Sequence, residues 1–154
     1  MKKDVVVKLT GIHERNGEKP EKVVTKANGT YENIEDYTVI KYIEESEDSS
    51  EQIENVLKLF ENRAEITRNG QIAAKMVFDA GSSFDTVYRT PFGEMDMTIN
   101  TKEFERRIFD STADETSGKS VFDKRLLSIR IRYVLEAAGK ELSKSYIRYE
   151  IEEK

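Results

Sequence analysis

His13 is the single histidine of a 154-residue chain that contains no cysteine, which narrows the chemistry available to its side chains. One imidazole without thiolates builds no ordinary zinc site. A Ser-His-Asp triad would have to use His13, although the chain has no Gly-x-Ser-x-Gly motif. We therefore expect no metal, no cofactor and no catalytic residue, with His13 solvated at the end of the first strand. The expected protein is not an enzyme.

Glu94 and Asp96 stand two residues apart, a spacing that brings both carboxylates to one face of a strand. Such a pair could perform general acid–base chemistry. Charged residues also alternate in this way on exposed strand faces. We expect the exposed arrangement, with Glu94 paired to Arg89.

Six apolar residues are expected to share one face of the central strands, and two interpretations of them stay open. They would form an adaptable pocket for an apolar ligand, or they would fill the interior with their own side chains. The packed interior is favoured because no converging polar group is evident that would orient a ligand. The six residues are Met76, Phe78, Phe84, Tyr88, Met95 and Met97.

The charge balance argues against nucleic acid as a partner, since 30 acidic residues outnumber 25 basic ones and the net charge is −5. Arg130, Arg132 and Arg148 could gather as an anion site, but interleaved glutamates favour an ion-pair network. No segment approaches transmembrane length, and the N-terminal apolar run is too short for a signal peptide. We expect no membrane partner and a cytoplasmic location.

Short segments of alternating apolar and polar residues recur along the chain and predict an all-β protein. The expected strands are 4–13, 21–31, 37–45, 54–60, 63–68, 72–79, 83–90, 93–101, 126–137 and 142–152. Two polar stretches, 46–51 and 110–119, are expected to be loops. Residues 53–60 also show helical spacing, but the strand that follows so closely favours a strand.

Turn residues predict the register of three hairpins, because cross-strand partners must share a face. A type I turn at Pro91 would pair Tyr88 with Met95 and Phe84 with Ile99. A three-residue loop with Gly70 at positive φ would pair Ile66 with Ile72 and Ala64 with Ala74. A three-residue loop at 139–141 would pair Tyr133 with Ile147 and set Arg132 opposite Arg148.

Ten such strands in one flat sheet would expose long edges, which closure into a barrel removes. We therefore predict a single domain, 1–154, that forms one antiparallel β-barrel. A two-sheet sandwich meets the same pattern and stays open as an alternative.

Residues 68–70, 76–78 and 88–95, followed by the closing hairpin 131–151, resemble the YwiB-like family. These are small bacterial proteins, a domain of unknown function, and the resemblance implies a calycin-type (lipocalin-like) barrel and a strand at 54–60. It carries over no catalytic residues. The chain departs from the family in a longer 110–119 loop, and it has no Trp, so the Gly-x-Trp signature of true lipocalins is absent.

Two functions remain open at this point. The barrel interior would bind a small apolar ligand through the six residues named above, or the outer surface would serve as an interaction or scaffold module, with a homodimer as one form. A wide internal cavity would favour the first function, and a symmetric apolar interface the second.

Overall fold

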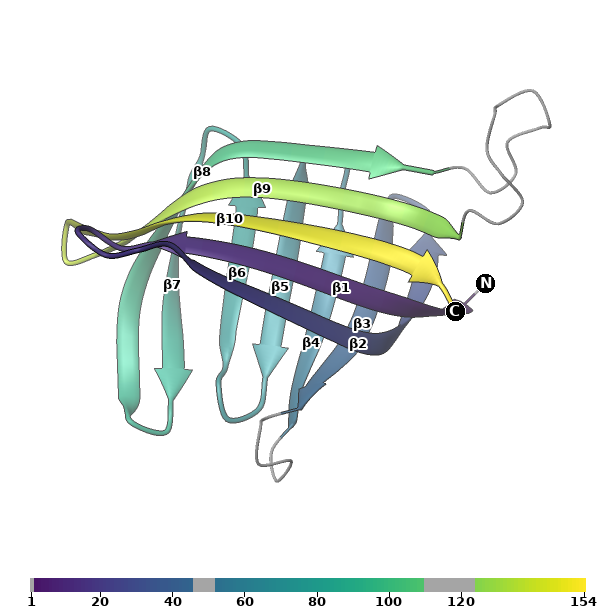
Figure 1. Ribbon diagram of the computed structural model, residues 1–154, viewed down its shortest axis with the longest axis horizontal. Coiled ribbons are helices and arrows are strands. Elements are labelled where there is room, and N and C mark those ends of the chain that lie inside the picture. Colours follow the sequence, from purple (N-terminus) through teal and green to yellow (C-terminus); the bar gives the residue numbers. More distant parts are fainter. Residues whose placement is uncertain (1, 46–51, 110–123) are drawn as a thin grey trace.

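A computed structural model describes residues 2–45, 52–109 and 124–154, and these residues form ten antiparallel strands (Figure 1). The strands are β1 (Lys2–Glu14), β2 (Glu21–Ile34), β3 (Tyr37–Glu45), β4 (Gln52–Leu59), β5 (Arg63–Asn69), β6 (Ala74–Asp79), β7 (Ser83–Thr90), β8 (Gly93–Ile108), β9 (Arg125–Ala137) and β10 (Lys140–Glu153). The two expected loops, 46–51 and 110–119, lie outside the described residues. Among those described, there is no helix long and apolar enough to cross a membrane.

The strands form one sheet that curls into a nearly closed barrel, as predicted. Its order is β6-β5-β4-β3-β2-β1-β10-β9-β8-β7, so the first and last strands of the chain lie side by side and β6 and β7 are the edges. These edges meet at a single bridge between Ala73 and Arg89. Nearby, the Thr86 hydroxyl donates to the Lys75 carbonyl at 2.6 Å. The single sheet rules out the sandwich.

Segment 53–60 is a strand rather than a helix. In β4, the side chains of Asn55, Leu57 and Leu59 are buried at every second position, which is the period of a strand with one inward face. The helical spacing of the apolar residues was therefore coincidental.

The β7–β8 hairpin has the register that its turn residues predict. Tyr88 pairs with Met95 and Phe84 with Ile99 across a turn at Pro91 and Phe92. The Thr90 hydroxyl accepts a hydrogen bond from the Phe92 backbone amide at 3.1 Å and so stabilises the turn.

The expected register after Asn69 is wrong. Ile66 pairs with Met76 and Arg68 with Ala74, so the loop is longer than three residues because Ala73 is drawn to Arg89 across the barrel seam. Gly70 does not adopt positive φ. It is needed for close approach instead, since a Cβ there would lie 2.6 Å from the Gln52 carbonyl oxygen.

The last hairpin also differs from the expectation. Its turn consists of Ala138 and Gly139, with φ of 52° and 76°, followed by a bulge between Glu141 and Ser143. Both turn residues have the positive φ of a type I′ turn, and alanine in place of the usual asparagine conceals it. Ile131 therefore pairs with Ile147, and Arg130 rather than Arg132 lies opposite Arg148. The shift is two residues, so every side chain keeps its face.

The apolar core fills the half of the barrel in which all neighbouring strands are paired. Phe78 is fully buried and its ring centroid lies 4.9 Å from that of Tyr133. At the other end the sheet splays, because β2 pairs with β3 only over Gly29–Ile34 and continues alone with β1 down to Glu21. In Figure 1 the tips of β1, β2, β9 and β10 consequently extend to the left, away from the β7–β8 hairpin.

Gly29 marks the point where β2 leaves β3, and it permits their closest approach. A Cβ at Gly29 would lie 2.4 Å from the Lys41 carbonyl oxygen, which is backbone and cannot give way cheaply. We expect Gly29→Ala to lower the free energy of unfolding by about 1–3 kcal/mol in urea denaturation. Gly11→Ala is the matched control, because the atoms nearest to its Cβ would belong to the His13 ring, with Nε2 at 3.0 Å, and not to the backbone. Equal losses in both variants would contradict this account of the corner.

Candidate functional site

The splayed end of the barrel contains a cavity of about 680 Å³ that opens to solvent. Every one of the ten strands contributes at least one side chain to its wall. The wall is mainly apolar, with Leu9 and Ile147 on one side and Met76 and Met97 on the other. The interior is thus packed in one half and hollow in the other, so the expectation of a filled barrel does not hold at this end.

Five of the six predicted apolar residues line this cavity. Met76, Phe78, Tyr88, Met95 and Met97 do so, and Met95 remains 50% exposed at the mouth. The sixth residue is not part of the wall: Phe84 packs against the core instead.

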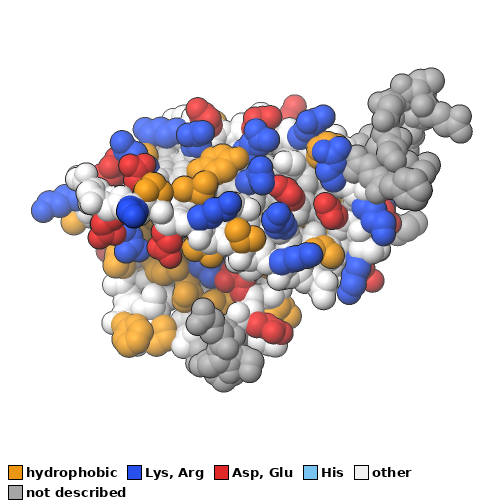
Figure 2. Space-filling model, viewed as in Figure 1, with side chains coloured by type: hydrophobic (Ala, Val, Ile, Leu, Met, Phe, Trp, Pro, Cys, Tyr) orange, Lys and Arg blue, Asp and Glu red, His pale blue; other side chains and the backbone are white. Residues whose placement is uncertain are grey.

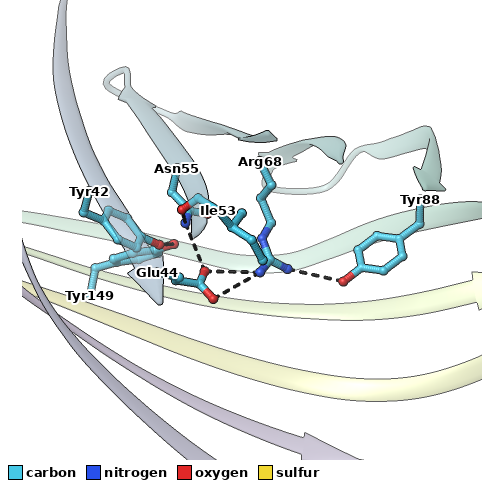
Figure 3. A network of polar contacts seen from close by, with 7 residues as sticks. All are labelled: Tyr42, Glu44, Ile53, Asn55, Arg68, Tyr88 and Tyr149. Atoms are coloured by element: carbon cyan, nitrogen blue, oxygen red, sulfur yellow. Dashed lines mark hydrogen bonds and ion pairs between the residues drawn. The ribbon is translucent and has the colours of Figure 1, made fainter. Parts of the chain in front are cut away.

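A network of polar side chains, which the sequence analysis missed, lines part of the cavity (Figure 3). Arg68 Nη2 donates to both carboxylate oxygens of Glu44, at 3.2 Å each, and Arg68 Nη1 donates to the Tyr88 hydroxyl at 3.3 Å. Asn55 Nδ2 donates to Glu44 Oε1 at 3.0 Å. The carboxylate is therefore held by two neighbours, and the guanidinium connects it to Tyr88 on β7, beyond the edge strand β6.

Strand alternation places these residues inside the barrel. Arg68 continues the inward series of Ala64 and Ile66 on β5, and Asn55 lies directly opposite Arg68 on β4. Glu44 continues the inward series of Tyr42 on β3. The signal available in the sequence was this period of two, extended to the polar end of each strand.

The ion pair between Glu44 and Arg68 is largely removed from solvent, with side chains 25% and 18% exposed. Charges in such surroundings are stable only when paired and hydrogen-bonded. Removing one partner would leave the other uncompensated in the cavity wall.

Buried tyrosines complete the inner end of the cavity. The hydroxyls of Tyr42 and Tyr149 lie 3.0 Å apart. Burial raises the pKa of Tyr42 to about 12 and the pKa of Tyr149 well above its usual value of 10.0. Burial likewise raises the pKa of Tyr133. All three phenols are therefore neutral hydroxyl groups at physiological pH.

His13 lies on the opposite wall and is not the solvated residue that we expected. It is half-buried, and its Nδ1 lies 2.8 Å from Ser145 Oγ, which in turn lies 3.3 Å from Ser143 Oγ. Burial lowers the pKa of His13 below 6.5, so the ring is mainly uncharged at pH 7. Glu94 and Asp96 are exposed, as expected, with Arg89 Nε 3.2 Å from Glu94 Oε1. In the part of the chain that the structure describes, no cluster of His, Asp and Glu could hold a metal ion.

Within the described residues, two of the three arginines of the last hairpin, Arg132 and Arg148, form ion pairs, and only Arg148 pairs with one of the interleaved glutamates of the hairpin. Arg148 Nε lies 2.8 Å from Glu150 Oε1, and Arg132 Nε lies 3.3 Å from Glu103 Oε2. Figure 2 shows the same mixture of basic and acidic side chains over the outer face of β1, β9 and β10, with apolar side chains gathered over the β7–β8 hairpin at the lower left.

The raised pKa of Tyr42 predicts a loss of stability at alkaline pH. In the unfolded chain Tyr42 releases its proton near pH 10, whereas in the folded chain it does so near pH 12. Proton release above pH 10 therefore favours the unfolded state, and stability is lost between those two values. Between pH 9 and pH 11, we expect the free energy of unfolding of Tyr42→Phe to fall by about 1 kcal/mol less than that of the wild type, measured by urea unfolding.

Tyr146→Phe is the control for this measurement, because Tyr146 lies on the outer face with the Arg132 guanidinium 5.3 Å from its ring centroid. Its stability profile should run parallel to that of the wild type. A parallel profile for Tyr42→Phe as well would contradict the burial of Tyr42.

Comparison with known proteins identifies relatives of the whole barrel. Residues 7–151 match the family model of a domain of unknown function, DUF1934. The crystal structure of the ywiB protein from Bacillus subtilis superimposes with a TM-score of 0.78 at 18% identity, covering 99% of this chain and 93% of that one. No curated protein matches the sequence. At this identity the structural likeness concerns the fold, and it agrees with the resemblance found in the sequence. The chain belongs to the DUF1934 family, the YwiB-like proteins.

Proposed function

We propose that this protein binds a small, mainly apolar molecule inside the barrel. The observation that carries the proposal is the cavity of about 680 Å³ at the splayed end. Binding sites for small molecules typically occupy about 300–1,000 Å³ and combine apolar walls with a few converging polar groups. The cavity has both, since the apolar side chains surround the Glu44–Arg68 network.

The methionines suit such a role. Met76, Met95 and Met97 face the cavity from β6 and β8, and their flexible thioethers adapt to ligands of different shape. Val23 and Leu142 lie at the mouth, 43% and 39% exposed, so an apolar ligand would meet an apolar rim on entry. A wall of this kind supports binding rather than catalysis, which is why we propose no enzymatic activity.

The outer surface offers a second candidate function, as a protein-interaction module. Phe92 is 99% exposed at the tip of the β7–β8 hairpin, and Val24 is 53% exposed on β2. Exposed aromatic side chains such as Phe92 are enriched in protein–protein interfaces, where they serve as anchors. The experiment below separates this role from ligand binding, because Phe92 does not line the cavity.

Binding of a neutral fluorescent dye, Nile red, tests the proposal. We expect Met95→Glu to weaken dye binding by about tenfold or more, because it places a charge at the apolar mouth. Met95 is half exposed, so this change should leave the protein folded. Phe92→Glu is the matched control, with the same new charge on the same hairpin but outside the cavity. If the dye does not bind, or if both variants weaken it equally, the interior is not the site.

A further inference from the structure

Resting on the proposed function, we infer that the ligand combines an apolar body with an uncharged hydrogen-bond acceptor, such as a hydroxyl or carbonyl oxygen, that meets the polar network in the cavity wall. The feature that carries this inference is the balance of charges and hydrogen-bond donors in this network. Its charges cancel within the Glu44–Arg68 pair, and its phenols retain hydrogens to donate (Figure 3).

The phenols supply the donors. The Tyr88 hydroxyl accepts from Arg68 Nη1, so its own hydrogen is directed elsewhere, and Tyr88 lines the cavity. Between Tyr42 and Tyr149 one hydroxyl donates to the other, which leaves one further hydrogen for another acceptor. Because burial raises the pKa of both Tyr42 and Tyr149, these hydrogens stay in place at neutral pH. A ligand head with an accessible oxygen lone pair fits this arrangement.

The charge balance disfavours a charged head. Glu44 is already held by Arg68 and Asn55, so an entering carboxylate would add a second negative charge beside it in low-dielectric surroundings. An entering ammonium would add a second positive charge beside Arg68. Burial keeps His13 mainly neutral through its lowered pKa. Arg15 is the remaining cation of the lining, and it is exposed at the mouth, where solvent screens it.

The apolar body would contact the rest of the wall. Leu9, Met97 and Leu135 line the cavity from three other strands. A ligand of this kind would meet apolar side chains along its body and hydrogen-bond donors at its polar group.

Competition between two probes with the same chain, 1-decanol and decanoate, tests the inference at pH 7.5 with Nile red as the reporter. In the wild type we expect 1-decanol to displace the dye at a concentration at least about tenfold lower. Any apolar site prefers the alcohol to some degree, so the change in this ratio on mutation is decisive. Glu44→Gln leaves Arg68 unpaired and should shift the ratio by about tenfold toward decanoate.

Glu94→Gln is the control, because it makes the same change in net charge on the exposed face of the β7–β8 hairpin. It should leave the ratio unchanged. Wild-type preference for decanoate, or equal ratios in the two variants, would overturn the inference while leaving the proposed function intact. Failure of Nile red to bind the wild type would overturn both.

Tyr88→Phe provides a second test should Glu44→Gln not fold. Tyr88 is only partly buried, and phenylalanine keeps its ring. We expect this variant to bind 1-decanol about fivefold more weakly and butylbenzene, which has no acceptor oxygen, as well as the wild type does. Equal weakening of both probes would show that the Tyr88 hydroxyl does not donate a hydrogen bond to the polar group of the ligand, and would overturn the inference.

Discussion

The ion pair between Glu44 and Arg68 is the interaction on which the rest of the site depends. Both charges lie inside a barrel, where each would cost several kcal/mol to hold alone. Arg68 Nη2 contacts both oxygens of Glu44, and Asn55 and Tyr88 satisfy further hydrogen-bonding groups of the pair. The pair and its neighbours thereby hold a fixed set of polar groups in a cavity wall that is otherwise mainly apolar. Loss of either charge would leave the other without a partner inside the barrel.

The shape of the sheet explains why the hollow half is open to solvent. β2 parts from β3 at Gly29. β8 pairs with β9 only from Thr98 onward, so the part of the β7–β8 hairpin nearer its turn has no β9 neighbour. Four strands therefore lean away on one side and one hairpin on the other. The edge strands β6 and β7 are a third weak point, because they do not pair along their length and the Ala73–Arg89 bridge lies at one end of them. A barrel without these departures would have closed over the polar network.

Local turn chemistry made part of this fold predictable. The strands follow from alternation, and the β7–β8 register follows from Pro91 and Gly93. The register at Gly139 could not be predicted in this way, because Ala138 adopts a positive φ, which alanine rarely does. The loop at Gly70 could not either, since its length depends on Ala73 pairing with a strand that is not its neighbour in sequence.

The cavity was only half predictable for a related reason. Alternation placed five apolar residues on its wall, because the face of a side chain depends only on its position along the strand. The polar network requires that Glu44, Asn55 and Arg68 meet. This depends on the pairing of three successive strands, and the middle one contains segment 53–60, whose sequence pattern also fits a helix. Each residue alone looked like an ordinary polar position near a strand end.

A double-mutant cycle on the ion pair tests this account most directly. The free energies of unfolding of Glu44→Gln, Arg68→Met and the double variant would be compared with that of the wild type. If the pair is held inside the barrel, each single variant leaves an uncompensated charge, and the coupling energy should be about 1–3 kcal/mol, with the double variant more stable than the sum of the single losses implies. Additive losses, with a coupling near zero, would mean that the two charges do not depend on each other and would contradict the account.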